Sequence, residues 1–238
     1  GSSPSGDQAA EFRYRNPTSE PNTLVIPISQ SGETADTIAA VREAAAKGAV
    51  VTALCNVVGS TIARESGRGV YLHAGPEISV ASTKAFSSQV VVLLLFALLL
   101  GRNRRLSRSE GNELADQIEQ IPELIRSVLL QAPEIKKIAE RYADKEDFFY
   151  IGRGCLYPTA LEGALKLKEI SYIHAEGYHA AELKHGPISL LDERHPVLAL
   201  ANDIPGKDKI IGNIQECRAR KAPVVAVITR GDSAVRSM

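Results

Sequence analysis

Short apolar runs that alternate with helical stretches constrain the fold of this chain more than any other feature. Apolar residues fill these runs, at residues 23–29, 49–55, 69–74, 147–152, 196–201 and 223–229. Continuous apolar runs of this length are typical of strands that are buried on both faces. Because helical stretches separate the runs, we predict an α/β fold of doubly wound, flavodoxin-like parallel sheets flanked by helices.

The strand–helix–strand pattern occurs twice. Residues 41–54 (VREAAAKGAVVTAL) align with residues 214–227 (IQECRARKAPVVAV) at a shift of about 173 positions. The second copy follows a strand, loop and helix that have no counterpart before the first copy. We therefore predict two domains, the first without its start and the second without its end, at residues 1–104 and 144–238, joined by connecting helices at residues 105–143.

The charge balance of the 238-residue chain excludes some classes of partner. Lys and Arg number 28, as do Asp and Glu, so the net charge is near zero. General nucleic-acid binding and attachment to an anionic membrane both favour a basic excess, and we predict neither. The cysteines are widely spaced and odd in number, so we expect reduced, mostly buried thiols and no zinc site, at Cys55, Cys155 and Cys217.

Neither the opening residues nor the longest apolar run has the pattern of a targeting or membrane segment. The opening residues, GSSPSGDQAAEF, have no basic region followed by an apolar one, so we predict no signal peptide. The apolar run at residues 90–100 is shorter than the roughly 18 residues that span a bilayer. We expect this run to form a fully buried core helix, and the protein to be soluble and cytoplasmic.

The turn at residues 29–34 (SQSGET) gathers hydroxyl and amide groups where a buried strand leads into a helix. We call it the serine-rich turn. Ser29, Ser31 and Thr34 supply hydroxyls, Gln30 supplies an amide, and a glycine allows close approach of a ligand. Since helix N-termini favour anions, this composition predicts a phosphate site. The alternative is that Ser31 or Thr34 only caps the helix. The aligned second turn, at residues 202–207, has lost the hydroxyls.

A second cluster of ionisable groups follows at residues 160–187. Glu162, Lys166 and Glu169 lie on one face of a predicted helix, and His185 stands in a short turn, Lys-His-Gly-Pro. A carboxylate and an imidazole can move protons near neutral pH. The alternative for the helix is ordinary ion pairing between residues four positions apart. We interpret the other histidines as structural or surface groups that form no metal site: His73, His174, His179 and His195.

Four motifs together resemble one family. SQSGETADT, GPEISVASTKAF, ALEGALKLKEISYIHAEGY and ELKHGP are similar to the isomerase part of the glutamine–fructose-6-phosphate aminotransferases, which is built from two sugar isomerase (SIS) domains. The resemblance runs from about residue 11 to the last residues. It implies an enzyme that binds fructose 6-phosphate, without metal or cofactor, and converts the ketose to glucosamine 6-phosphate with ammonia from a separate glutaminase domain. It also implies a homodimer.

The resemblance assigns roles to individual residues. It implies that Glu169 moves the proton between C1 and C2 with the help of Lys166, and that His185, from the neighbouring subunit, opens the sugar ring. It further implies a set of substrate-binding residues, of which the first four hold the phosphate and the last two line the sugar pocket: Ser29, Gln30, Ser31, Thr34, Val80 and Ser82.

Some parts of that family have no match in this chain. They are the glutaminase domain, the first SIS strand with its serine loop, and the C-terminal tail with its Schiff-base lysine, so we expect no complete synthase reaction from the chain alone. Two other functions remain open. One is an SIS regulator that binds a sugar phosphate, and the other is an SIS deglycase or isomerase without a glutaminase domain.

Overall fold

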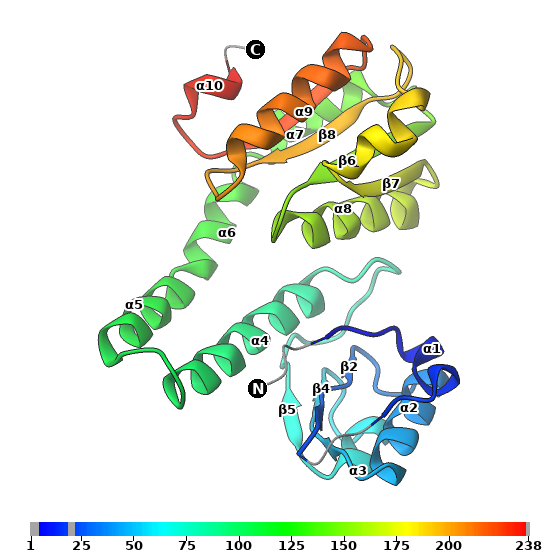
Figure 1. Cartoon of the computed structure of the whole chain (residues 1–238), viewed down its shortest axis with the longest axis vertical. Helices are drawn as coiled ribbons and strands as arrows, with labels where there is room; N and C mark the ends of the chain where they lie inside the picture. The colour runs from blue at the N-terminus through cyan, green and yellow to red at the C-terminus, as the bar shows by residue number, and fades with distance from the viewer. Residues whose placement is uncertain (1–4, 19–21, 237–238) are drawn as a thin grey trace. The chain divides into compact units, whose positions relative to one another are not determined.

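The structure is a computed structural model of the chain, and it describes residues 5–18 and 22–236. The outer ends of the two predicted domains, including the first residues of the segment examined for a signal peptide, lie outside these ranges. By contacts the chain forms two compact units, unit 1 at Gly1–Leu124 and unit 2 at Ile125–Met238. Each unit is described by itself (Figure 1).

Unit 1 opens with short helical turns and continues as alternating strands and helices. In order these are α1 (Ala9–Phe12), η1 (Arg13–Arg15), β1 (Leu24–Val25), β2 (Ile28–Ser29), α2 (Ala35–Ala46), β3 (Val50–Val51), β4 (Ala53–Cys55), α3 (Thr61–Ser66), β5 (Gly69–Tyr71), α4 (Lys84–Arg102) and α5 (Arg108–Glu119). α6 (Ile121–Leu129) runs across the boundary between the units.

The strands of unit 1 are parallel, as predicted. β1 pairs with β3, and a second sheet has the order β2-β4-β5. The runs at residues 23–29 and 49–55 are each two short strands rather than one. Pro27 interrupts the first run because it has no N–H to donate, yet its carbonyl accepts from Leu54 N at 2.9 Å. The pairing therefore continues past the break.

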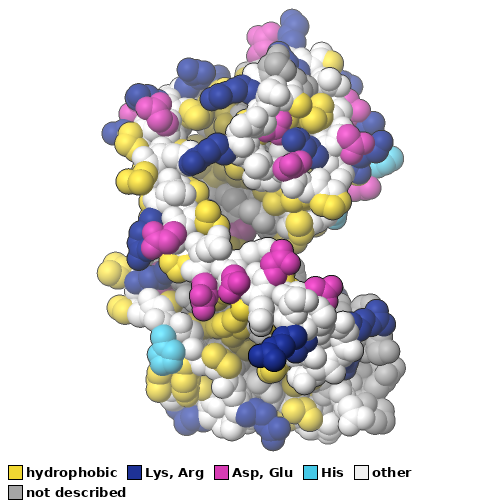
Figure 2. All heavy atoms as spheres, turned by 90° about the vertical axis from the view of Figure 1, so that its left-hand side faces the viewer, with side chains coloured by type: hydrophobic (Ala, Val, Ile, Leu, Met, Phe, Trp, Pro, Cys, Tyr) yellow, Lys and Arg dark blue, Asp and Glu magenta, His cyan; other side chains and the backbone are white. Residues whose placement is uncertain are grey.

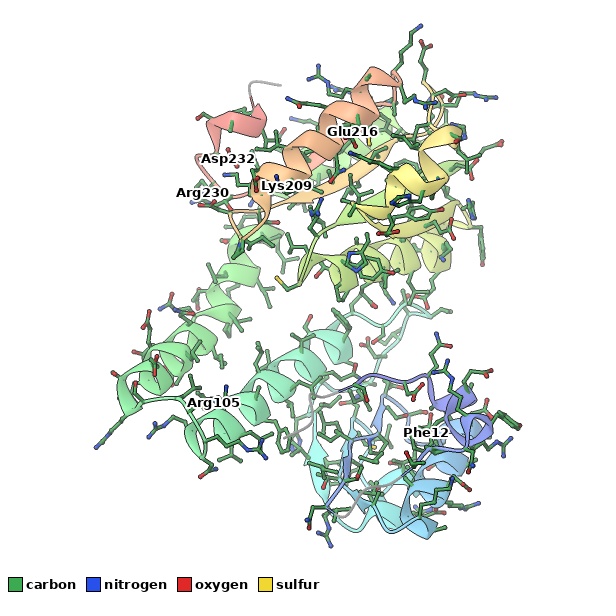
Figure 3. The ribbon with its side chains drawn as sticks, viewed as in Figure 1. Phe12, Arg105, Lys209, Glu216, Arg230 and Asp232 are labelled. Atoms are coloured by element: carbon green, nitrogen blue, oxygen red, sulfur yellow. The ribbon has the colours of Figure 1, made fainter. Side chains whose placement is uncertain are left out.

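Helices α2 and α3 cover the strands of unit 1 and complete its core (Figure 1). Small and β-branched side chains fill this core: Val41, Ala44, Val51, Ala53, Cys55 and Ile62. Phe12 of α1, labelled in Figure 3, packs against the same cluster. Since the core fixes α2 and α3 against the strand ends, it also fixes the loops that leave those ends.

Unit 2 contains one continuous parallel sheet. Its elements are α7 (Ala132–Arg141), β6 (Asp147–Gly152), α8 (Leu156–Ser171), β7 (His174–His179), η2 (Glu182–His185), η3 (Pro187–Leu190), β8 (Val197–Ala201), α9 (Lys207–Ala219), β9 (Val224–Ile228) and α10 (Ser233–Arg236). The strand order is β7-β6-β8-β9. The β8–α9–β9 segment repeats the strand–helix–strand pattern of unit 1, as the sequence alignment predicts.

Strand β7 was not predicted. Its sequence, HAEGYH, mixes polar with small and aromatic residues, and it lies at the edge of the sheet, where only β6 pairs with it among the described strands. Gly177 lets β7 approach α8 closely, because a Cβ at this position would lie 2.8 Å from Leu161 Cα. Continuous apolar runs predict strands that are covered on both faces, and an edge strand of this composition has no such run.

The connecting helices are shorter than their apolar stripe suggests. Apolar residues recur at helical spacing over residues 114–129, but the structure divides this segment between α5 and α6. A capping box starts α5, in which Ser107 Oγ accepts from Glu110 N and Glu110 accepts from Ser107 N. Pro122 lies in the first turn of α6, where the missing N–H costs nothing.

The prediction that residues 90–100 form a fully buried core helix was wrong. They belong to α4, a helix of 19 residues, and only 6% of its most apolar window is buried. The side chains of α4 are apolar on all of its faces, so full burial would need neighbours on every side. Among the described residues its main partner is α5. Leu94, Leu95 and Leu99 of α4 are exposed. Figure 2 shows apolar side chains at the surface of the face that it draws. By length and composition α4 could cross a membrane, which for a single helix is weak evidence.

The cysteines agree with the prediction except at one position. All are free thiols; Cys55 and Cys217 are buried, but Cys155 is exposed. Burial raises the pKa of the Cys217 thiol to about 12 and also raises the pKa of Cys55. Cys155 stands directly before α8, on a loop rather than in the sheet, and so stays at the surface.

Candidate functional site

The serine-rich turn connects β2 to α2 and is folded on itself. Ser29 Oγ accepts from Gly32 N at 2.9 Å, and Ser31 Oγ accepts from Glu33 N at 3.2 Å. Gly32 has a φ of +67°, a left-handed conformation that favours glycine. Thr34 is the N-cap residue of α2, but its side chain makes no capping bond. Capping α2 therefore does not account for the Thr34 hydroxyl.

The turn is tied to the start of α3. Ile62 N donates to Gly32 O at 3.0 Å, and Thr61 N donates to the Glu33 side chain at 2.8 Å. The Thr61 N–H holds the pKa of Glu33 below its ordinary value of 4.5. Glu33 thus fastens the turn to a neighbouring helix, a role that the sequence did not suggest.

Part of the serine-rich turn is accessible to a ligand. Ser29 is buried, Gln30 and Ser31 are half-buried, and Thr34 is exposed. The first N–H groups of α2 have no partner within the helix, and the helix dipole adds positive charge there. Hydroxyls, an amide and helix N–H groups at the carboxyl end of a parallel strand can together hold an anion.

The loop that carries Val80 and Ser82 is held by a carboxylate. Glu77 Oε1 accepts from Ala85 N at 2.8 Å, from Thr83 N at 3.1 Å and from Ser82 Oγ at 3.4 Å. Glu77 therefore caps α4 and folds the loop against its first turn. The Val80 side chain is 87% exposed, so its own unit leaves it free to contact a ligand.

Asn56 brings this loop and the serine-rich turn together. Its backbone N donates to Gln30 O at 3.2 Å, and its side chain bonds Gly75 O at 2.7 Å and Ala74 N at 3.0 Å. The six predicted substrate-binding residues of unit 1 thus belong to two connected segments. The sequence signal for this connection is Asn56, which directly follows the buried strand β4 and lies outside the four motifs.

Helix α8 of unit 2 brings Glu162, Lys166 and Glu169 into contact, as their spacing predicts. Lys166 Nζ lies 2.6 Å from Glu169 Oε2 and 3.3 Å from Glu162 Oε1. All three side chains are partly buried, with exposed fractions of 22% to 27%. Partial burial lowers the pKa of Lys166, but the two carboxylates outweigh it, and the pKa is raised above 10.5. The cluster is therefore more than a solvated ion pair.

His185 is presented by a different segment of unit 2. It ends η2, where Leu183 is fully buried and Lys184 pairs with Glu216 of α9 at 2.7 Å. Gly186 follows with a φ of +139°, which only glycine adopts readily. His185 itself is exposed. Among the described residues, the hydrogen bonds and ion pairs do not join His185 to Glu169.

The second turn, residues 202–207, confirms that the two helix starts differ. Gly206 precedes α9, and Lys207 Nζ lies 2.7 Å from Asp232 Oδ2 and 3.5 Å from Asp203 Oδ1. Figure 3 labels Asp232 in the segment after β9. The charges at this helix start are paired with one another, whereas the serine-rich turn presents neutral donors.

Lys166→Met tests the charge cluster through the pH dependence of stability. Because the folded pKa of Lys166 is raised, its contribution is fully present below pH 10.5 and is lost as the pH rises through the raised value. We expect the variant to be less stable at neutral pH, by about 1 kcal/mol. Melting temperatures of both chains, from about pH 7 to pH 12, should converge at the alkaline end. A difference that stays constant across this range would contradict the assignment.

Comparison with known proteins places these features in a family. Residues 4–99 and 141–237 match the model of the SIS domain. The chain is 52% identical, over 232 residues, to glutamine–fructose-6-phosphate aminotransferase [isomerizing] of Chlorobaculum tepidum, and 48% identical, over 230 residues, to that of Thermus thermophilus. These alignments cover 98% and 96% of the chain but only 38% of each relative.

Solved structures give the same result. The C-terminal domain of glucosamine-fructose-6-phosphate aminotransferase from Francisella tularensis matches with a TM-score of 0.93 and 40% identity, over 98% of this chain and 65% of that one. A putative phosphosugar isomerase from Silicibacter pomeroyi matches with a TM-score of 0.77 and 30% identity, over 94% and 65%. With one matching segment in each half, the chain belongs to the SIS domain family.

Proposed function

We propose that this chain is the sugar-phosphate isomerase half of a glucosamine-6-phosphate synthase. It binds fructose 6-phosphate and catalyses the ketose–aldose step that yields glucosamine 6-phosphate, with ammonia from a glutaminase domain. The relatives that share about half of its residues are named as aminotransferases that isomerise. The observation that carries the proposal is the contact between Lys166 and Glu169, because a protein that only senses a sugar phosphate needs no proton-transfer group.

In this proposal the serine-rich turn holds the phosphate. Ser29, Gln30, Ser31 and Thr34 supply neutral donors, and the N-terminus of α2 supplies partial positive charge. Val80 and Ser82 line the sugar, on the loop that Asn56 connects to the turn. Glycine at position 32 keeps the backbone close to the phosphate oxygens. Binding here depends on geometry rather than on a basic side chain.

The chemistry in this proposal belongs to Glu169, Lys166 and His185. His185 moves the proton that opens the ring of the ketose. In the open form, ammonia has replaced the C2 carbonyl oxygen, which leaves as water, to give an imine. The Glu169 carboxylate takes a proton from C1 and returns it to C2; the imine nitrogen gains a proton and the C1 hydroxyl loses one, so that the double bond moves from C2=N to C1=O. Lys166, 2.6 Å from Glu169, keeps the carboxylate oriented and stabilises its charged form. While Glu169 carries the proton it can exchange it with solvent, and no electrons enter or leave.

The proposal extends to the assembly of the protein. We infer a homodimer, a glutaminase domain in the full-length protein and a cytoplasmic location. The support is the similarity to aminotransferases of which this chain spans 38%, since their remaining length can hold a further domain. Dimerisation is included because the family resemblance assigns His185 to the site of the neighbouring subunit.

The phosphate assignment is tested by the double variant Ser31→Ala/Thr34→Ala. Hydrogen bonds to a charged group contribute about 1.5–3 kcal/mol, so we expect fructose 6-phosphate to bind at least roughly tenfold more weakly. Isothermal titration calorimetry measures the affinity. Ser109→Ala in α5, whose hydroxyl contacts Ser107 at 3.1 Å, is a control that should leave binding unchanged. Equal affinity of the double variant and the original chain would overturn the assignment.

A further inference from the structure

The segment that presents His185 is held on two sides. In the 3₁₀ helix η2 three residues make one turn, so neighbouring side chains point about 120° apart. Leu183 points into the core and is 0% exposed. Lys184 points to α9, where its Nζ lies 2.7 Å from Glu216 Oε1. The third direction, toward solvent, is left to His185. The orientation of the imidazole therefore depends on both anchors.

The anchor on α9 is itself oriented. The second carboxylate oxygen of Glu216 accepts from Asn213 Nδ2 at 3.2 Å. Asn213 is 4% exposed, and its Oδ1 accepts from Arg153 Nη1 at 3.1 Å. Arg153 directly follows β6. Both carboxylate oxygens of Glu216 thus have a partner. One pairs with Lys184 of η2, and the other accepts from the buried amide of Asn213, which Arg153 at the end of β6 holds in place. Figure 3 labels Glu216 on α9, with Lys209 on the same helix.

Stability alone does not explain this arrangement. The side chains of Lys184 and Glu216 are 56% and 33% exposed, and ion pairs with this exposure contribute little to folding. The hydrogen bond from the Lys184 ammonium group keeps the pKa of Glu216 below its ordinary value of 4.5, so the carboxylate is charged at neutral pH. The pair fixes the orientation of η2, because it ties Lys184, the residue next to His185, to helix α9.

We propose that Glu216 is a positioning residue, which acts through Lys184 to set the orientation of the His185 imidazole. This rests on the proposed function, in which His185 opens the sugar ring. Glu216 touches no substrate in this account. Its loss should slow ring opening and leave the transfer of the C1 proton unaffected, since that transfer belongs to Glu169.

The first test follows His185 directly by NMR. Glu216→Gln keeps the shape of the side chain and removes the charge that holds Lys184. The matched control is Asp208→Asn, which removes a carboxylate from the same helix, 3.4 Å from Lys209 Nζ. We expect the ring Cε1–H signal of His185 to shift or broaden in Glu216→Gln and to stay in place in Asp208→Asn. An unchanged His185 signal in Glu216→Gln would overturn the proposal.

The second test separates ring opening from proton transfer. 5-Deoxyfructose 6-phosphate lacks the hydroxyl that closes the furanose ring, so it is always open. Exchange of the C1 proton in D₂O is measured for both sugars. With fructose 6-phosphate we expect Glu216→Gln to be roughly tenfold to a hundredfold slower than the original chain, and with the deoxy sugar we expect equal rates.

The outcomes distinguish the two hypotheses. Equal losses with both sugars, or no loss with either, would contradict a positioning role for Glu216. If the original chain exchanges neither sugar, the proposed function fails, and the His185 signal alone decides the role of Glu216. A shifted signal together with a loss confined to fructose 6-phosphate supports both.

Discussion

Gly32→Ala should abolish the binding of fructose 6-phosphate and destabilise unit 1. The φ of +67° costs a side chain about 1–3 kcal/mol, and the new Cβ would lie 2.1 Å from Ser60 Oγ and 2.5 Å from Ser60 Cβ. Relieving this overlap must move either the turn or the start of α3. We expect a loss of roughly 3–5 kcal/mol in the free energy of unfolding, measured by urea denaturation, and no detectable binding by calorimetry.

A control and a rescue make this prediction specific. Gly48 also has a positive φ, of +84°, but a Cβ there would meet nothing within 4 Å. Gly48→Ala should therefore cost only the backbone term, about 1–2 kcal/mol, and spare binding. Adding Ser60→Gly to Gly32→Ala removes both clashing atoms and should restore part of the stability. If Gly32→Ala resembles Gly48→Ala in both measurements, the close contact with Ser60 has no structural importance.

Glu169→Gln should stop the proton transfer without weakening substrate binding. The amide has nearly the same shape as the carboxylate but cannot accept a proton, and a positioned general base contributes about 10²- to 10⁴-fold to a rate. We expect the exchange of the C1 proton in D₂O to fall by that factor, while the affinity for fructose 6-phosphate stays within about twofold.

The neighbouring carboxylate provides the comparison. Glu162→Gln also removes a carboxylate charge, which lies 3.3 Å from Lys166 Nζ, but leaves Glu169 in place. We expect this variant to lose far less exchange activity than Glu169→Gln. Equal losses in the two variants would mean that the charge cluster acts as a unit, and that Glu169 is not the base.

Parallel strands and their helices could be predicted because continuous apolar runs mark the strands, although burial on both faces is incomplete in unit 1, where Leu24, Ile28 and Val50 are exposed. The runs at residues 23–29 and 49–55 form parallel pairs, and even Pro27 interrupts them only briefly. β7 could not be found in this way, since an edge strand needs no continuous apolar run. The burial of α4 was overestimated for a related reason. Its sequence gives the apolar character of the helix but not the neighbours that would cover it.

The contact within the charge cluster could be predicted, whereas the residues that hold the loops could not. The spacing of Lys166 and Glu169 correctly places them in contact, because residues three and four positions apart share one face of a helix. Glu33, Glu77 and Asn56 were missed. Glu33 and Asn56 hold loops through backbone groups 18 to 28 positions away, and those partners depend on how the strands are ordered. Glu77 bonds backbone N–H groups six and eight positions away, across a loop that forms no helix or strand before α4.

NMR of fructose 6-phosphate in D₂O, with this chain as catalyst, tests the central claim most directly. We expect deuterium to replace hydrogen at C1 and glucose 6-phosphate to appear, because a carboxylate that moves a proton between C1 and C2 also exchanges it with solvent. Binding of fructose 6-phosphate without exchange at C1, in a chain with an intact Lys166–Glu169 pair, would contradict the account and indicate a protein that only binds the sugar phosphate.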